Sequence, residues 1–403
     1  MNENKSKISP AAKEVLKIIE SHQFQAYFVG GCVRDSLLKK DITDIDIATS
    51  ASPEEIMDIF SAVIPIGLEH GTVLVRHQQE SYEITTFRTE STYSNQRHPD
   101  KVVFVTDIKE DLARRDFTIN AMAMNYRGEL VDPFFGQTDL QQRLIRTVRQ
   151  PEERFQEDAL RIIRALRFSS QLGFTIDKAA LIEMKRLAPS LEQISVERIT
   201  QEMEKFFQGD AIQSGLQYLK ETKIACFLPI LKKSPQLVEQ IPEKLTPFQS
   251  FGEVIAFFYL LDPTYSIAAW TKAWKCSNKE KNVAKHLVEN VERWLQEGRT
   301  NWLVYNLEEA CFSMFIHLLA DVYNNRTLRL QELLYIKEKL PILSRKELCI
   351  DGKWLQNHFI EKKSGPWIGQ VLQEIEYLVV TGQLNNNLLE IKEWIQCHPP
   401  ESD

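Results

Sequence analysis

The chain has 403 residues and a formal net charge of −7, with 43% hydrophobic and 26% charged residues. This composition excludes a disordered protein, and the length exceeds that of one compact core, so roughly two to four domains are expected. No apolar run reaches the ~18 residues that span a bilayer, and the N-terminus lacks the apolar core of a signal peptide. We therefore expect a cytoplasmic protein that does not enter a membrane.

The cysteines and the net charge bear on the kind of protein and on its partner. Six cysteines are scattered without a Cys-x-x-Cys pair, which predicts reduced thiols rather than a disulfide framework or a zinc site. They are Cys32, Cys226, Cys276, Cys311, Cys349 and Cys397. The negative net charge weakly opposes a nucleic-acid partner, but local basic surfaces can still bind phosphate. Composition therefore leaves the partner open.

The first ~150 residues combine short strand and helix patterns, which predicts a small α+β domain. Strands are predicted at residues 25–31, 44–50 and 101–105, and a hairpin at residues 71–77 and 81–87. Helices are predicted at residues 11–22, 32–39, 53–60 and 110–124. From residue 151 onward, long helical patterns run on with few strand signals, which predicts an all-helical remainder.

All seven tryptophans lie in the last third of the chain, within this helical region. They are Trp270, Trp274, Trp294, Trp302, Trp354, Trp367 and Trp394. Large aromatic side chains usually anchor helical cores, and we favour this role over stacking on RNA bases.

The segment EDALRIIRALRF, residues 157–168, is predicted to be one continuous helix because nothing in it breaks a helix. Asp158, Arg161, Arg164 and Arg167 follow one another at intervals of three, so they form a slanting stripe on the helix surface. A solvated face would explain such a stripe, but the apolar residues between these positions suggest a helix that is packed on most sides.

Glycines and carboxylates near the N-terminus suggest a phosphate site. Gly30 and Gly31 end a predicted strand, where backbone N–H groups can approach an anion, and Arg34 can reach the same anion. A plain tight turn is the alternative. Asp44 and Asp46 would share one face of the next strand and repel each other unless a cation such as Mg²⁺ lies between them. Together these features favour metal-assisted phosphoryl or nucleotidyl transfer.

Further charged residues are candidates for the same site. Glu83 on a later strand is the candidate third carboxylate, although an exposed strand glutamate is nearly as plausible. In RRDFTIN, Arg115 is a candidate contact to phosphate or base, and Asp116 a candidate acceptor for a ribose hydroxyl. A surface ion pair is the alternative for these two residues.

Four motifs, in this order and spacing, resemble those of class II CCA-adding enzymes, which are tRNA nucleotidyltransferases of the DNA polymerase β superfamily. They are GGxxRD at 30–35, DxD at 44–46, RRDFTIN at 114–120 and EDALRxxRxxR at 157–167. SVERITQEMEKFF at 195–207, which contains Ser195, Glu197, Arg198 and Glu202, is similar to a helical motif in the neck of that family. Residues 365–384 resemble its tail more weakly.

The resemblance implies an α+β protein with a small mixed α/β nucleotidyltransferase head followed by an all-α neck, body and tail. The expected ranges are 1–150 for the catalytic head, 151–210 for the nucleotide-selecting neck, 211–300 for the body and 301–403 for a tail that binds tRNA. The implied activity is the addition of C, C and A to the tRNA 3′ end from CTP and ATP, and the repair of damaged ends, without a nucleic-acid template.

The resemblance also implies roles for single residues. Asp44 and Asp46 would be catalytic and hold Mg²⁺, and Gly31 and Arg34 would hold the triphosphate. The remaining implied nucleotide contacts are Arg115, Asp158, Arg161, Arg164 and Arg167. C and A both present an amine donor beside a ring-nitrogen acceptor, whereas G and U present the reverse. A carboxylate beside a guanidinium, as in Asp158 and Arg161, can therefore accept C and A and reject G and U.

Other functions stay open at this point. A bacterial poly(A) polymerase shares the head and neck, but the C-terminal sequence IQCHPPESD is not the basic tail that would favour it. A partial enzyme that adds only CC or only A is a further alternative. Enzymes that add only CC characteristically lack a basic flexible loop, whereas Arg88 and Arg97 are present in the loop region 88–100 here. From another class, the chain could be an inactive RNA-binding protein, although the retained site residues argue against this. The sequence does not decide whether the chain forms a homodimer.

Overall fold

The computed structural model describes residues 8–91 and 101–399. The chain divides into two compact units, Met1–Glu239 and Gln240–Asp403, each described here by itself. The finer division into head, neck, body and tail remains a prediction.

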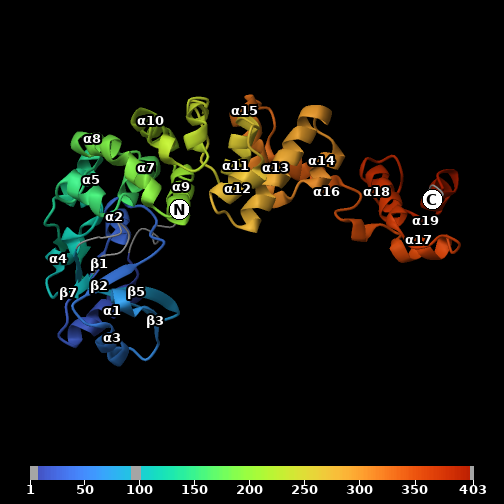
Figure 1. Ribbon diagram of the computed structural model, residues 1–403. Coiled ribbons are helices and arrows are strands. Elements are labelled where there is room, and N and C mark those ends of the chain that lie inside the picture. The colour runs from blue at the N-terminus through green and yellow to red at the C-terminus, as the bar shows by residue number, and fades with distance from the viewer. Residues whose placement is uncertain (1–7, 92–100, 400–403) are drawn as a thin grey trace. The chain divides into compact units, whose positions relative to one another are not determined.

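A seven-stranded sheet organises the N-terminal part of the first unit (Figure 1). Its strand order is β3-β4-β5-β2-β1-β8-β9, and only β2 and β5 run parallel to each other. The strands are β1 Ala26–Val29, β2 Asp46–Thr49, β3 Val63–Gly67, β4 Thr72–His77, β5 Glu80–Thr86, β8 Ala123–Met124 and β9 Leu130–Val131. A separate hairpin pairs β6 Arg88–Ser91 with β7 Lys101–Phe104.

The strand predictions at 25–31, 71–77, 81–87 and 101–105 are confirmed, and β4 and β5 form the predicted hairpin. The strand predicted at 44–50 begins only at Asp46, because residues 41–45 have no regular structure. Strand β3, whose five residues include Pro65 and Gly67, and the two-residue strands β8 and β9 are not predicted from the sequence.

The helices of this part are α1 Pro10–Ser21, α2 Gly31–Leu37, α3 Pro53–Ile59, α4 Ile108–Ala113 and α5 Gly136–Gln142. The first three confirm the predicted helices. The helix predicted at 110–124 is wrong beyond Ala113, where the chain turns into the 3-10 helix Thr118–Asn120 and then into β8. Pairing of Ala123 with Val29 and of Met124 with Phe28 extends the sheet, and this long-range pairing outweighs the local helical pattern.

Five helices complete the first unit: α6 Pro151–Glu157, α7 Leu160–Leu172, α8 Lys178–Leu187, α9 Val196–Phe207 and α10 Ile212–Thr222. Helix α7 packs against both α9 and α10. The helical region also contains one short strand, since β11 Thr175–Ile176 pairs in parallel with β10 Leu144–Ile145.

The continuous helix predicted at 157–168 is wrong at its start. Helix α6 ends at Glu157, Asp158 has an extended backbone, and α7 begins at Leu160. The Asp158 side chain accepts a hydrogen bond from the Leu160 N–H at 3.0 Å, so it serves one of the unpaired donors at the start of α7. Asp158 therefore does not continue the helical stripe of arginines.

The second unit is helical. Its α-helices are α11 Phe251–Leu261, α12 Ile267–Ala273, α13 Asn278–Glu297, α14 Asn301–Asn306, α15 Phe312–Tyr323, α16 Leu330–Lys339, α17 Gly352–His358, α18 Pro366–Val380 and α19 Leu388–Cys397. The 3-10 helices in the described part of the chain are Leu68–His70, Thr118–Asn120, Ala188–Gln193, Ile224–Phe227, Leu231–Lys233, Pro235–Val238, Glu309–Cys311 and Arg345–Glu347. No helix in residues 8–91 and 101–399 is long and apolar enough to cross a membrane.

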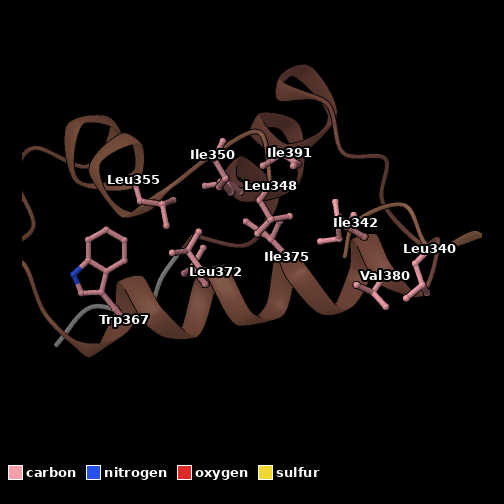
Figure 2. Packing of buried hydrophobic residues seen from close by; sticks show 13 residues of the cluster. Leu340, Ile342, Leu348, Ile350, Leu355, Trp367, Leu372, Ile375, Val380 and Ile391 are labelled. Atoms are coloured by element: carbon pink, nitrogen blue, oxygen red, sulfur yellow. The ribbon is translucent and has the colours of Figure 1, made fainter. Parts of the chain in front are cut away.

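Tryptophan side chains pack in the hydrophobic cores of this unit, as predicted. Trp270 and Trp274 are buried beside aromatic side chains of α11. Figure 2 shows the hydrophobic cluster around α18, in which Trp367, Leu372 and Ile375 face Leu355 and other apolar side chains. Trp302, Trp354 and Trp394 pack at its edge.

Candidate active site

One cavity of about 740 Å³ in the first unit contains most of the predicted site residues. Elements from the sheet region and from α7 and α9 contribute to its wall. The predicted residues that line it are Gly31, Arg34, Asp44, Asp46, Arg115, Asp116, Asp158, Arg161, Arg164 and Arg167. The sequence alone could not show that the arginines of α7 face the carboxylates of the sheet.

The glycine turn is held open by its backbone. Gly30 has φ +72° and ψ −131° between β1 and α2, a conformation that residues with a Cβ rarely adopt. A Cβ at Gly30 would lie 3.1 Å from Nη1 of Arg115 and 3.7 Å from Oδ2 of Asp46. The glycine therefore lets these two side chains approach the turn.

Asp46 is the first residue of β2 and Asp44 lies two residues before this strand, and both predicted metal ligands line the cavity. Removal of water by the surrounding protein raises the pKa of the Asp46 carboxyl group. Arg115 opposes this rise, whereas the Asp44 carboxylate adds to it. Among the described residues, no three His, Cys, Asp or Glu side chains form a metal-binding group by themselves.

Glu83 lies directly beside Asp46 in the parallel pairing of β5 with β2. It does not line the large cavity but a neighbouring one of about 160 Å³, which shares Asp46 and Arg115 with it. Desolvation raises the pKa of Glu83, Asp46 raises it further and Arg88 lowers it. The three carboxylates of the prediction are thus neighbours, although Glu83 faces a different cavity.

Asp116 is buried at the base of the large cavity, with 8% of its surface exposed. Its Oδ2 accepts a hydrogen bond from Nε of Arg164 at 2.7 Å and forms an ion pair with Nη2 of the same residue at 2.6 Å. Its Oδ1 accepts a hydrogen bond from Asn120 at 3.2 Å. Burial alone would raise the pKa of Asp116, but Arg164 and the hydrogen bonds lower it to about 2. This ion pair joins two residues far apart in the sequence and is not the surface pair considered above.

The arginines of α7 are not a solvated face. Arg161 and Arg167 are each 7% exposed, and each of the three arginines has a carboxylate partner. Glu202 of α9 pairs with both Arg164 and Arg167, at 3.2 and 3.0 Å. The sequence places Glu202 in the neck motif but does not predict it as a site residue. Its partners lie 35 or more positions earlier in the sequence, so no local pattern indicates the pairing.

Asp158 and Arg161 line the same cavity but are not partners of each other. Asp158 pairs with Arg198 of α9 at 2.7 Å. Arg161 donates to Glu157 at 2.6 Å and to the backbone carbonyls of Arg154 and Arg114 at 2.9 and 3.1 Å. The break in the helix at Asp158 separates the two side chains, so each is oriented by its own set of neighbours.

Arg114 and Arg115 share one buried carboxylate. Asp111 of α4 lies 2.9 Å from Nη2 of Arg114 and 3.1 Å from Nη2 of Arg115. Burial opposes the ionisation of Asp111, but the two guanidinium groups lower its pKa. Arg115 is thereby held beside Gly30 and Asp46. The backbone N–H of Arg88 also donates to Asp111, at 3.3 Å. Arg97, the other arginine of the predicted loop, lies outside the described residues.

Family models match three segments of the chain. Residues 26–146 match the poly A polymerase head domain, and residues 173–234 match a probable RNA and SrmB-binding site of polymerase A. Residues 247–395 match a putative domain 2 of tRNA nucleotidyltransferases.

Relatives cover nearly the whole chain. A CCA-adding enzyme of Oceanobacillus iheyensis is 47% identical over 97% of this chain and 98% of its own length. One of Enterococcus faecalis is 43% identical over 93% of this chain and 92% of its own length. The crystal structure of the Bacillus stearothermophilus CCA-adding enzyme in complex with CTP matches with a TM-score of 0.84 and 34% identity, over 97% of this chain and 98% of that one. The chain belongs to the family of CCA-adding enzymes.

Proposed function

We propose that this CCA-adding enzyme builds and repairs the tRNA 3′ end by adding C, C and A from CTP and ATP, with its own side chains in place of a template. The observation that carries the proposal is that one cavity is lined by the Gly30–Gly31 turn, by the carboxylates Asp44, Asp46 and Asp116, and by Asp158 and Arg161. These are the parts that binding and transferring a nucleotide require.

The chemistry of Asp44 and Asp46 fits a divalent cation, which nucleotidyltransferases of the polymerase β type generally use. The Asp44 carboxylate raises the pKa of Asp46, and a cation between the two side chains would relieve this repulsion. Mg²⁺ characteristically binds one or two carboxylates together with substrate phosphates, so two protein ligands are enough. A bound Mg²⁺ supplies the charge that activates the tRNA 3′-hydroxyl and offsets charge on the departing pyrophosphate. Glu83 remains the candidate third carboxylate, because it lies directly beside Asp46 in the sheet.

The triphosphate and the ribose are assigned to the residues around Gly31. The backbone at Gly31 and the guanidinium of Arg34 would hold phosphate oxygens, and Arg164 and Arg167 would add positive charge. Arg115, which lies beside Gly30, would contact the nucleotide near the metal. Asp116 is ionised over the whole physiological range and would accept a hydrogen bond from a ribose hydroxyl.

The base is assigned to Asp158 and Arg161. The carboxylate of Asp158 would accept from the exocyclic amine of C or A, and the guanidinium of Arg161 would donate to the adjacent ring nitrogen. G and U would place a carbonyl against the carboxylate and an N–H against the guanidinium. Each unsatisfied buried group costs ~1–3 kcal/mol, which is enough to select between the two pairs of bases.

Three tRNA substrates, ending before the first C, after CC and after CCA, test this function when CTP, ATP, UTP and GTP are offered separately and together. We expect C, C and A to be added in order, with no extension of the complete end. Long A tails would identify a poly(A) polymerase, which the match of residues 26–146 makes the second candidate. Arrest at CC with ATP present would identify a CC-adding enzyme, and no incorporation would identify an RNA-binding protein.

A further inference from the structure

Three arginines of the large cavity gather around one aromatic ring. The guanidinium carbon of Arg167 lies 4.3 Å from the ring centroid of Phe168, that of Arg34 5.3 Å and that of Arg164 5.4 Å. All three distances lie within the ~6 Å at which a cation is attracted to the negative face of an aromatic ring. Arg34 comes from α2, whereas the other two come from α7, so the ring joins two separate elements of the site.

The ring itself is fixed in place. Phe168 is 3% exposed and packs edge to face against the fully buried Phe117, with centroids 5.7 Å apart and an interplanar angle of 84°. A buried ring that is closely packed in this way has little freedom to move with the arginines. It is therefore a stable reference point for the guanidinium groups.

Additional carboxylates could hold these arginines more firmly, but they would add negative charge where a triphosphate is to bind. Arg34, Arg164 and Arg167 are already paired with Asp35, Asp116 and Glu202. Their mutual repulsion and burial are nevertheless costly, since burial first and then Arg164 lower the pKa of Arg167 to about 10. An aromatic ring attracts a cation without adding negative charge, so it helps to hold the guanidinium groups without neutralising them further.

We propose that Phe168 is a positioning residue for triphosphate binding, because its ring holds Arg34, Arg164 and Arg167 in place through cation–π attraction. The inference rests on the proposed function, in which these arginines contact the nucleotide. The triphosphate is common to CTP and ATP, so a change at Phe168 alters the KM of both nucleotides equally. The preference for C and A over U and G does not change, because the ring of Phe168 does not hold the proposed base readers, Asp158 and Arg161.

Replacement of Phe168 by 4-fluoro-, 3,5-difluoro- and 3,4,5-trifluorophenylalanine tests the proposal. Fluorine withdraws electrons from the ring face with little change in ring size, so cation–π attraction weakens at each step. We expect the KM for CTP and for ATP to rise stepwise, by on the order of tenfold for the trifluorinated ring. The same series at Phe155 is the matched control, since Phe155 is fully buried and no cation lies over its ring among the described residues.

Two results would overturn the proposal. One is a series at Phe168 that is as flat as the series at Phe155, and the other is a rise in KM that differs between CTP and ATP. Arg34→Ala, Arg164→Ala and Arg167→Ala separate this failure from failure of the proposed function. If these variants bind CTP normally, the nucleotide assignment itself is wrong. If they bind CTP weakly while the fluorinated series is flat, only the role of Phe168 is wrong.

Discussion

Arg198 of α9 donates to Asp158 at 2.7 Å, across 40 positions of sequence. The other oxygen of Asp158 accepts the Leu160 N–H at 3.0 Å, so the carboxylate is fixed at two points. A carboxylate that is held in this way presents its remaining lone pairs in a fixed direction. A fixed acceptor is what recognition of the exocyclic amine of a base requires. We therefore expect Arg198 to act on base selection through Asp158, if Asp158 reads the base as proposed.

Loss of Arg198 is the first prediction. Arg198→Ala frees the Asp158 carboxylate to rotate, so the ratio of kcat/KM for CTP to that for UTP should fall by about tenfold, or ~1.4 kcal/mol. In the Asp158→Ala background the same change should have little further effect on the ratio. Steady-state kinetics with all four nucleotides on one tRNA measure both ratios. Arg186→Ala, which removes a half-exposed arginine of α8, is the control. Equal losses for all four nucleotides would contradict this role.

The second prediction concerns the metal carboxylates. Asp44→Ala and Asp46→Ala should each lower incorporation by roughly 10³-fold or more, because several kcal/mol of charge stabilisation are lost. Binding of tRNA, measured by gel shift without nucleotide, should stay near that of the unchanged protein. Asp41→Ala removes an exposed carboxylate from the same segment and serves as the control. Normal turnover in either of the first two variants would refute the assignment.

The third prediction tests the glycine turn. Gly30→Ala forces a Cβ into a conformation that costs ~1–3 kcal/mol and places it 3.1 Å from Arg115, so both the melting temperature and kcat/KM should fall. Gly31→Ala brings its Cβ no closer than 3.8 Å to Arg34 and should be milder. Gly128→Ala, with φ +89° and no atom within 4 Å, isolates the backbone cost. The idea fails if Gly30→Ala loses no more activity than Gly128→Ala.

The fourth prediction concerns acid stability. The pKa of Asp116 is about 2 in the folded chain, below its ordinary value of 3.8, so its ionisation stabilises the fold above pH 3.8. This contribution, about 2 kcal/mol, is lost as the pH falls from about 4 to 2. Asp116→Asn should therefore be less stable at pH 7 and equally stable near pH 2.

Hydrogen exchange in α7 is the suitable measurement for Asp116→Asn, because every tryptophan lies in the second unit and its fluorescence would report on that unit. Asp139→Asn, which removes another buried carboxylate of the first unit, is the comparison. A difference between Asp116→Asn and the unchanged protein that persists undiminished at pH 2 would exclude the linkage.

Short-range sequence patterns were enough to predict several strands, the glycine turn and the family of this protein. Alternating apolar residues predicted β1, β4 and β5, and Gly30 before α2 marked the turn, because these signals depend on neighbours within a few positions. The ordered motifs likewise predicted the family and most residues of the large cavity. Such motifs keep their spacing along the chain, so they can be read without a structure.

Only the tertiary structure decided how these residues are paired. The sequence alone suggested that Asp158 and Arg161 form one pair on one helix, whereas the chain breaks at Asp158 and gives each a separate partner. It likewise could not show that Glu83 lies beside Asp46, or that Arg34 reaches the ring of Phe168. These contacts join positions tens of residues apart, and their free energy comes from desolvation and packing, which local patterns do not contain.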